Sequence, residues 1–143
     1  MQFERVKSGV PGFDDLVGGG LPRGYCYTVA GGPGSGKTTF ALQFIYNGIT
    51  EYGENGVYVS LDESSKSIRA SALSFSMNPE DLEKAGKLVI VDASPIRMEV
   101  GRYVVRTPAM LGIPNFNIDT VLATIHEVVE KIGAKRVAVD SLT

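Results

Sequence analysis

Two periods of apolar residues alternate along the chain, and together they predict an α/β fold. Short, nearly continuous apolar runs are typical of buried strands, and they lie at 25–30, 57–61, 88–91 and 137–140. Apolar residues at helical spacing follow three of these runs, over 38–49, from about 64 onward and over 118–132. Strands that alternate with amphipathic helices indicate a mainly parallel sheet with helices on both faces, arranged in three layers.

Capping residues indicate where two of these helices begin and end. The last helix has Asn117 as its expected cap and Gly133 as its terminator. The helix after the second strand has Ser64 or Ser65 as its cap, because a serine side chain can accept a hydrogen bond from the first turn. This helix carries three apolar side chains on one side, namely Ile68, Ala72 and Phe75.

Composition and charge narrow the class of protein. The 143 residues, 43% apolar and 21% charged, suffice for a single domain over 1–143 with a buried core. A net charge of -2 gives no general electrostatic case for nucleic acid or an acidic membrane, so any nucleic-acid contact would be local. The single cysteine, Cys26, falls in an apolar run and is expected to be a small core residue. No apolar stretch approaches the roughly 18 residues of a membrane span, so we expect a cytoplasmic protein without a membrane partner.

Two segments fall outside the alternation of strands and helices. Residues 1–24 are rich in turn-forming residues and are interpreted as a lead-in segment rather than a domain. Residues 93–117 have no helical period and form an irregular loop or insertion, longer than most connections in compact domains. This loop is either a hairpin packed on the domain's edge, which we favour, or a surface that contacts DNA or a partner through Arg97, Arg102, Tyr103 and Arg106.

Residues 31–38 fit the phosphate-binding pattern G-x-x-x-x-G-K-[ST] at every fixed position. Glycines let successive backbone N–H groups turn toward phosphate oxygens, and the N-terminal end of the following helix favours the same anion. Lys37 would reach the β- and γ-phosphates, and the Thr38 hydroxyl would bind Mg²⁺. ATP and Mg²⁺ are therefore the expected cofactors, with a binding set of Gly31, Gly32, Pro33, Gly34, Ser35, Gly36, Lys37, Thr38 and Thr39.

Acidic residues end two of the predicted strands. Asp140 closes the last apolar run and is the second expected Mg²⁺ ligand, with Thr38. Asp62 and Glu63 follow the second strand and are candidates to orient or deprotonate the attacking water, although acids also favour a helix start for simple electrostatic reasons. Ligands of parallel sheets bind beyond the strands' carboxyl ends, so the expected catalytic residues Lys37, Asp62 and Glu63 would meet there.

Three separated strings resemble the KaiC branch of the RecA-like P-loop ATPases. They are GVPGFDDLVGGGLPRG at 9–24, VSLDE at 59–63 followed by Ile68 and Arg69, and RVAVDSLT at 136–143. The resemblance implies a RecA-like fold and places Asp62 and Glu63 where the family has paired catalytic glutamates. Asp62 is one methylene shorter than the first of these glutamates. Either the shorter side chain slows hydrolysis or Glu63 takes over the role.

The resemblance also implies a larger assembly than this chain forms alone. It implies a core with further strands and ATP held near the subunit boundaries of a ring or filament, so a homo-oligomer is expected, and the protein partner is unknown. Without further strands, the apolar run 25–30 would be a sheet edge open to pairing. We therefore expect either a piece of a longer protein or a short relative completed by another chain.

Three functions are compatible with these features. The leading one is an ATP-binding, Mg²⁺-dependent ATPase that works in an oligomer, and the family resemblance adds autokinase activity as an open alternative. The second is a nucleotide-gated binding or regulatory module with little hydrolysis, which Asp62 in place of glutamate favours. The third is a recombinase-related DNA-binding ATPase, which the acidic balance of the chain disfavours.

Overall fold

The computed structural model describes residues 3–94 and 118–141, in which strands and helices alternate. In chain order the elements are β1 (Arg5–Val6), α1 (Phe13–Leu16), β2 (Leu21–Pro22), α2 (Lys37–Tyr52), β3 (Gly56–Ser60), α3 (Ser65–Ser74), α4 (Pro79–Lys84), β4 (Leu88–Asp92), α6 (Ile118–Ile132) and β5 (Arg136–Asp140). None of the helices in these two ranges has both the length and the apolar character needed to cross a membrane.

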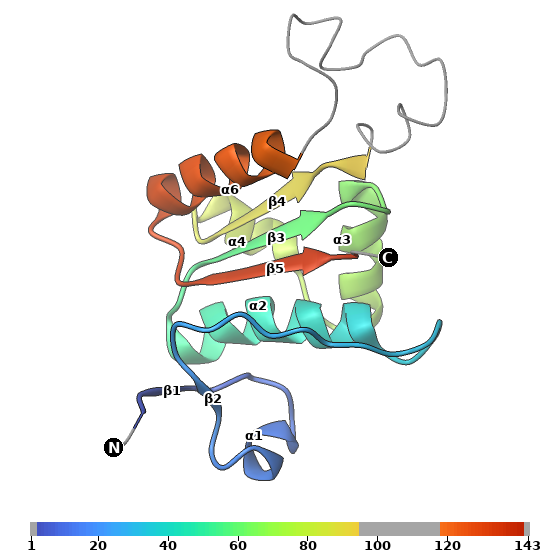
Figure 1. Ribbon diagram of the computed structural model, residues 1–143. Coiled ribbons are helices and arrows are strands. Elements are labelled where there is room, and N and C mark those ends of the chain that lie inside the picture. The colour runs from blue at the N-terminus through green and yellow to red at the C-terminus, as the bar shows by residue number, and fades with distance from the viewer. Residues whose placement is uncertain (1–2, 95–117, 142–143) are drawn as a thin grey trace, which may run out of the picture.

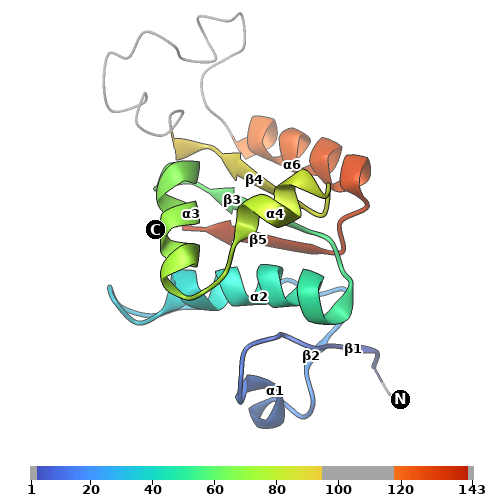
Figure 2. The same cartoon turned by 180° about the vertical axis from the view of Figure 1, so that it is seen from behind.

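The main sheet is parallel, with the strand order β4-β3-β5. Helix α6 packs on one face through Val57 and Val59, whereas α2, α3 and α4 pack on the other face around Tyr58. Figure 1 shows the sheet from one side, and Figure 2 shows α3 and α4 from behind. The three-layer α/β fold that the sequence predicts is therefore confirmed.

The central strand and the edge strand of the sheet differ in burial. Strand β3 lies in the middle of the described sheet, and all five of its residues are buried. Strand β5 lies at one edge, where Val137 is 41% exposed and Val139 is 39% exposed. The prediction of a fully buried last strand is therefore wrong. An apolar sequence alone does not tell a central strand from an edge strand.

The run 25–30 is not a strand, contrary to the sequence prediction. Tyr25, Tyr27 and Val29 are 44–64% exposed, and Cys26 is exposed rather than in the core. Within the described residues no strand lies beyond β5, so the segment has no neighbouring strand to supply backbone hydrogen bonds.

The observed helix ends coincide with capping and terminating residues. Ser64 caps α3 by accepting a hydrogen bond from the Ser67 amide, and Gly133 follows α6 with a left-handed φ of 64°. Gly53 ends α2 in the left-handed region, as expected of a glycine that follows the last helical residues. Phe75 is exposed because it falls at the C-cap of α3, past the last packed turn. The expected cap of α6, Asn117, lies outside the described residues.

The lead-in segment packs on the main domain through a buried arginine. Strands β1 and β2 pair in an antiparallel manner, with α1 between them in the chain. Arg136, the first residue of β5, is only 2% exposed and donates hydrogen bonds to the carbonyls of Lys7, Ser8 and Phe44. Its guanidinium also pairs with Glu54 at 2.9 Å and lies over the Phe44 ring. One cation thus joins the lead-in, α2 and the sheet.

Gly48 makes room for this arginine on α2. A Cβ atom at Gly48 would lie 2.5 Å from Arg136 Cδ and 2.8 Å from its Cζ, inside van der Waals contact. We expect Gly48→Ala to destabilise the protein by about 1–3 kcal/mol, because the guanidinium is fixed by its bonds and cannot move aside. In a helix interior alanine is normally about 1 kcal/mol more favourable than glycine. A loss of stability in Gly48→Ala would therefore be opposite in sign to the ordinary effect of this substitution.

Urea unfolding measures this effect. The control is Glu51→Ala, at an exposed position of the same helix, for which we expect a change within about 0.5 kcal/mol. A Gly48→Ala protein as stable as the parent would show that Arg136 is not tightly held.

Glu54, the ion-pair partner of Arg136, makes the stability of the protein depend on pH. Burial raises the pKa of Glu54, but hydrogen bonds and charge from Arg23 and Arg136 outweigh it and hold the pKa below its usual value. A depressed folded pKa contributes stability that is complete above the unfolded pKa of about 4.3 and is lost as the pH falls through the folded pKa. We therefore expect the free energy of unfolding to fall below about pH 5, and Glu54→Gln to reduce that fall.

Urea unfolding of both proteins between pH 3 and pH 7 checks this expectation. Parallel curves for the parent and Glu54→Gln would contradict it, because the variant cannot lose a charge at this position.

Candidate functional site

The predicted site residues gather at one edge of the sheet, where the strands end and α2 begins. Figure 1 shows the carboxyl ends of β3 and β5 on the same side as the N-terminal end of α2. The two strands run parallel with Ser60 opposite Asp140, so their last residues reach the same level. Asp62 and Glu63 follow β3 directly at this edge.

The loop 31–36 is exposed and shaped for an anion. Gly34 and Gly36 adopt left-handed φ values of 75° and 93°, which side chains with a Cβ rarely tolerate. Gly36 is the N-cap of α2 and makes no side-chain cap, so no cap side chain covers the amides of the first helical turn. A helix start with open amides suits phosphate oxygens through both hydrogen bonding and the helix dipole. Lys37, half-buried, is the first residue of α2.

Thr38 and Asp140, the two predicted metal ligands, lie in direct contact. The Thr38 hydroxyl donates a hydrogen bond to Asp140 Oδ2 at 2.8 Å across 102 residues of sequence. Within the described residues, no three His, Cys, Asp or Glu side chains form a site that could hold a metal by themselves. One hydroxyl and one carboxylate are nevertheless the hard oxygen donors that suit Mg²⁺, which usually takes one or two carboxylates together with substrate phosphates. The residues therefore fit a metal that arrives with a nucleotide.

Tyr58 is a third partner of this pair, and the sequence reasoning did not find it. Its hydroxyl donates to the same Asp140 Oδ2 at 2.7 Å. Burial, the hydrogen bond to Asp140 and the nearby charges of Asp140 and Glu63 all raise the pKa of Tyr58, so the phenol stays protonated. The available signal was the strand period, because a polar tip on the α2 face of β3 needs a partner on that face.

The turn that carries Asp62 and Glu63 is held by Ser60. The Ser60 hydroxyl donates to the Glu63 carbonyl and accepts from the Glu63 amide, while the Leu61 amide donates to the Asp140 carbonyl at 2.7 Å. Both acidic side chains are exposed to solvent. The backbone of this turn is thus held at the carboxyl ends of β3 and β5, while both acidic side chains remain open to solvent.

Asp92, at the end of β4, is a further acid that the sequence reasoning left out. It accepts hydrogen bonds from the Ser65 amide at 2.8 Å and from the amide and hydroxyl of Ser94. Burial raises the pKa of Asp92, but these hydrogen bonds outweigh it and lower the pKa overall. All these donors come from the start of α3 and the end of β4, so Asp92 positions the helix that follows the Asp62–Glu63 turn.

The loop predicted at 93–117, whether the favoured hairpin or a surface that contacts DNA or a partner, falls almost wholly on 95–117, outside the described residues. Arg97, Arg102, Tyr103 and Arg106 lie outside the described residues.

Comparisons with known proteins identify relatives of this chain. A UPF0273 protein of Aeropyrum pernix is 37% identical over 144 residues, which cover 98% of this chain and 55% of that protein. The circadian clock oscillator protein KaiC of Prochlorococcus marinus is also 37% identical, over 100% of this chain and 27% of the clock protein. The chain therefore spans about half the length of the first relative and about a quarter of the second.

A solved structure gives the same result for the fold. The KaiC-like protein of Pyrococcus horikoshii OT3 superposes with a TM-score of 0.79 at 43% identity, over 97% of this chain and 54% of that protein. The family model described as "ATPase: KaiC" matches residues 6–143. By sequence and by fold, the chain belongs to the KaiC family of ATPases.

Proposed function

We propose that this chain binds ATP with Mg²⁺ at residues 31–39 and hydrolyses it. The observation that carries the proposal is the hydrogen bond from Thr38 to Asp140, at the end of α2 where the glycine loop opens. This bond joins a hydroxyl next to the glycine loop to a carboxylate at a strand end. Their contact is the arrangement that a metal bound to a nucleotide requires.

The roles follow from the chemistry of each group. The amides of the loop and the first turn of α2 bind phosphate oxygens, and Lys37 supplies the positive charge next to them. Thr38 and Asp140 hold Mg²⁺, which when bound neutralises charge on the phosphate oxygens. Asp62 and Glu63 orient the attacking water or accept its proton; their turn follows β3 directly, is held by Ser60, and leaves both side chains exposed.

Removing the lysine tests the binding step. We expect Lys37→Ala to weaken ATP binding about 10- to 100-fold, since hydrogen bonds to charged groups contribute about 1.5–3 kcal/mol. Isothermal titration calorimetry with ATP and Mg²⁺ measures the affinity. The matched control is Lys84→Ala, an exposed lysine on α4, which should bind as the parent does. Equal affinity of Lys37→Ala and the parent would refute the assignment of the phosphate site.

Neutralising the acidic pair tests hydrolysis separately. We expect Asp62→Asn and Glu63→Gln to keep ATP affinity, and at least one of them to slow single-turnover hydrolysis about 10²- to 10⁴-fold, the usual contribution of a general base. The variant that loses more of its hydrolysis rate identifies the principal residue. If both variants hydrolyse ATP at the parent rate, neither acid activates the water.

A nucleotide-gated binding module is the second candidate, and Asp62 is the observation that favours it. A carboxylate one methylene shorter than glutamate reaches less far from the turn, which would slow hydrolysis while leaving the phosphate loop intact. Tight ATP binding without product in a single-turnover experiment would support this candidate. In either case we propose that the chain acts within an oligomer, which sedimentation with and without ATP measures.

A further inference from the structure

We propose that Tyr58 is a positioning residue for the metal–nucleotide site, because its hydroxyl holds the carboxylate of Asp140 from within the core. The inference rests on the proposed function, since Asp140 is taken as a metal ligand. Nothing in the sequence motifs points to a tyrosine here, and a phenylalanine would satisfy the apolar pattern of β3 equally well.

The sheet register brings the two residues together. Tyr58 lies opposite Ala138, so Asp140, two residues further along β5, is on the same face of the sheet. The tyrosine side chain reaches diagonally across to Asp140 Oδ2 at 2.7 Å. Diagonal neighbours on parallel strands are within reach of long aromatic side chains but not of short ones.

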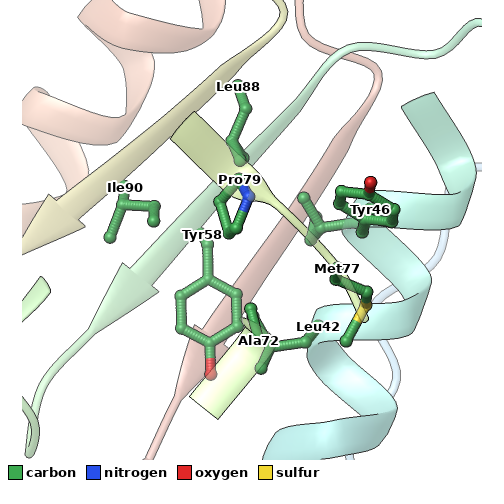
Figure 3. A pocket seen from close by; sticks show the side chains of 9 residues that line it. Leu42, Tyr46, Tyr58, Ala72, Met77, Pro79, Leu88 and Ile90 are labelled. Carbon is green, nitrogen blue, oxygen red and sulfur yellow. The ribbon is translucent and has the colours of Figure 1, made fainter. Parts of the chain in front are cut away.

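The surroundings of the ring keep the hydroxyl in place. Tyr58 is 1% exposed and lines a cavity of about 10 Å³ together with apolar side chains of α2, α3, α4 and β4. Figure 3 shows its ring beside Ala72, with the hydroxyl directed away from Leu88 and Ile90. So small a cavity holds at most one water and leaves no room for the ring to swing. The ring is therefore a rigid support for its hydroxyl.

Asp140 needs such a support more than other residues of the site. It ends an edge strand, and within the described residues no further strand packs beside it. Its side chain accepts from Thr38 and Tyr58 at the same oxygen. Thr38 has to serve both the metal and Asp140, whereas Tyr58 donates its single hydroxyl hydrogen to Asp140. Hydrogen-bond partners of metal-ligating groups typically change metal affinity about 10- to 100-fold when removed.

A purely structural role of the Tyr58 hydroxyl would give a different experimental result. Tyr58→Phe keeps the ring and removes only the hydroxyl, and Asp140 Oδ2 still accepts a hydrogen bond from Thr38, so no buried group is left without a partner and the variant should fold. If the hydroxyl served packing only, its loss would affect stability and leave metal binding unchanged.

The test measures metal and nucleotide affinities separately, on the full chain. Mn²⁺ binding to the complex with a non-hydrolysable ATP analogue is followed by electron paramagnetic resonance, and analogue binding alone is measured by calorimetry in EDTA. For Tyr58→Phe we expect Mn²⁺ affinity to fall about tenfold, near the lower limit because Thr38 remains, while metal-free affinity changes less than twofold. Saturating Mn²⁺ should return ATP hydrolysis to near the parent rate.

The matched control is Tyr46→Phe. Tyr46 lines the same cavity, and its side chain is not among the described groups that bond to Asp140, so this variant should leave both affinities unchanged.

Each other outcome is decisive. Unchanged Mn²⁺ affinity in a folded Tyr58→Phe protein overturns the inference, and so does an equal loss of metal-free affinity, which would mean a general disturbance of the site. A variant without a cooperative thermal transition would show that the hydroxyl serves the fold and would also overturn it. If the parent binds neither the analogue nor Mn²⁺, the proposed function itself fails. If the parent binds both and Tyr58→Phe binds Mn²⁺ equally well, only this inference fails.

Discussion

The parallel register between β3 and β5 is the constraint on which the rest of the structure depends. It places Arg136, Ala138 and Asp140 on the face that α2 covers. Four residues of strand span about 13 Å, and the ten residues of helix from Thr38 to Gly48 span about 15 Å. Because these lengths match, one register brings Arg136 to the C-terminal half of α2 and Asp140 to its N-terminal end. A slip by one residue would turn both side chains toward α6.

Arg136, the buried first residue of β5, is in an unusual place for a cation. Moving a guanidinium out of water is costly, and pairing alone often fails to compensate. Arg136 is compensated by more than its ion pair, because three backbone carbonyls and the Phe44 ring also surround it. Those carbonyls come from the lead-in and from α2. The charge that would be a liability in isolation thereby fixes the position of a segment whose own sheet has only two short strands.

The sequence predicted what depends on local patterns and missed what depends on distant partners. Three of the four strand runs, the Ser64 cap and the glycine loop before α2 were visible because propensity and motif act over a few residues. Tyr58 was missed because its partner lies 82 residues away. Arg136 was missed for the same reason, since arginine is rarely buried without distant partners. The strand at 25–30 was wrongly predicted, because an apolar run forms a strand only where a neighbour supplies hydrogen bonds.

The two halves of the site are held in place by different means. The glycine loop and the acidic turn are exposed, and their shape follows from backbone conformations that glycine and Ser60 make accessible. Asp140, in contrast, ends an edge strand, where the sheet constrains a side chain least. Its orientation has to come from side-chain donors, one on the helix that begins at the loop and one on the central strand. Through the bond from Tyr58, the carboxylate of Asp140 takes its position from β3, whose five residues are all buried.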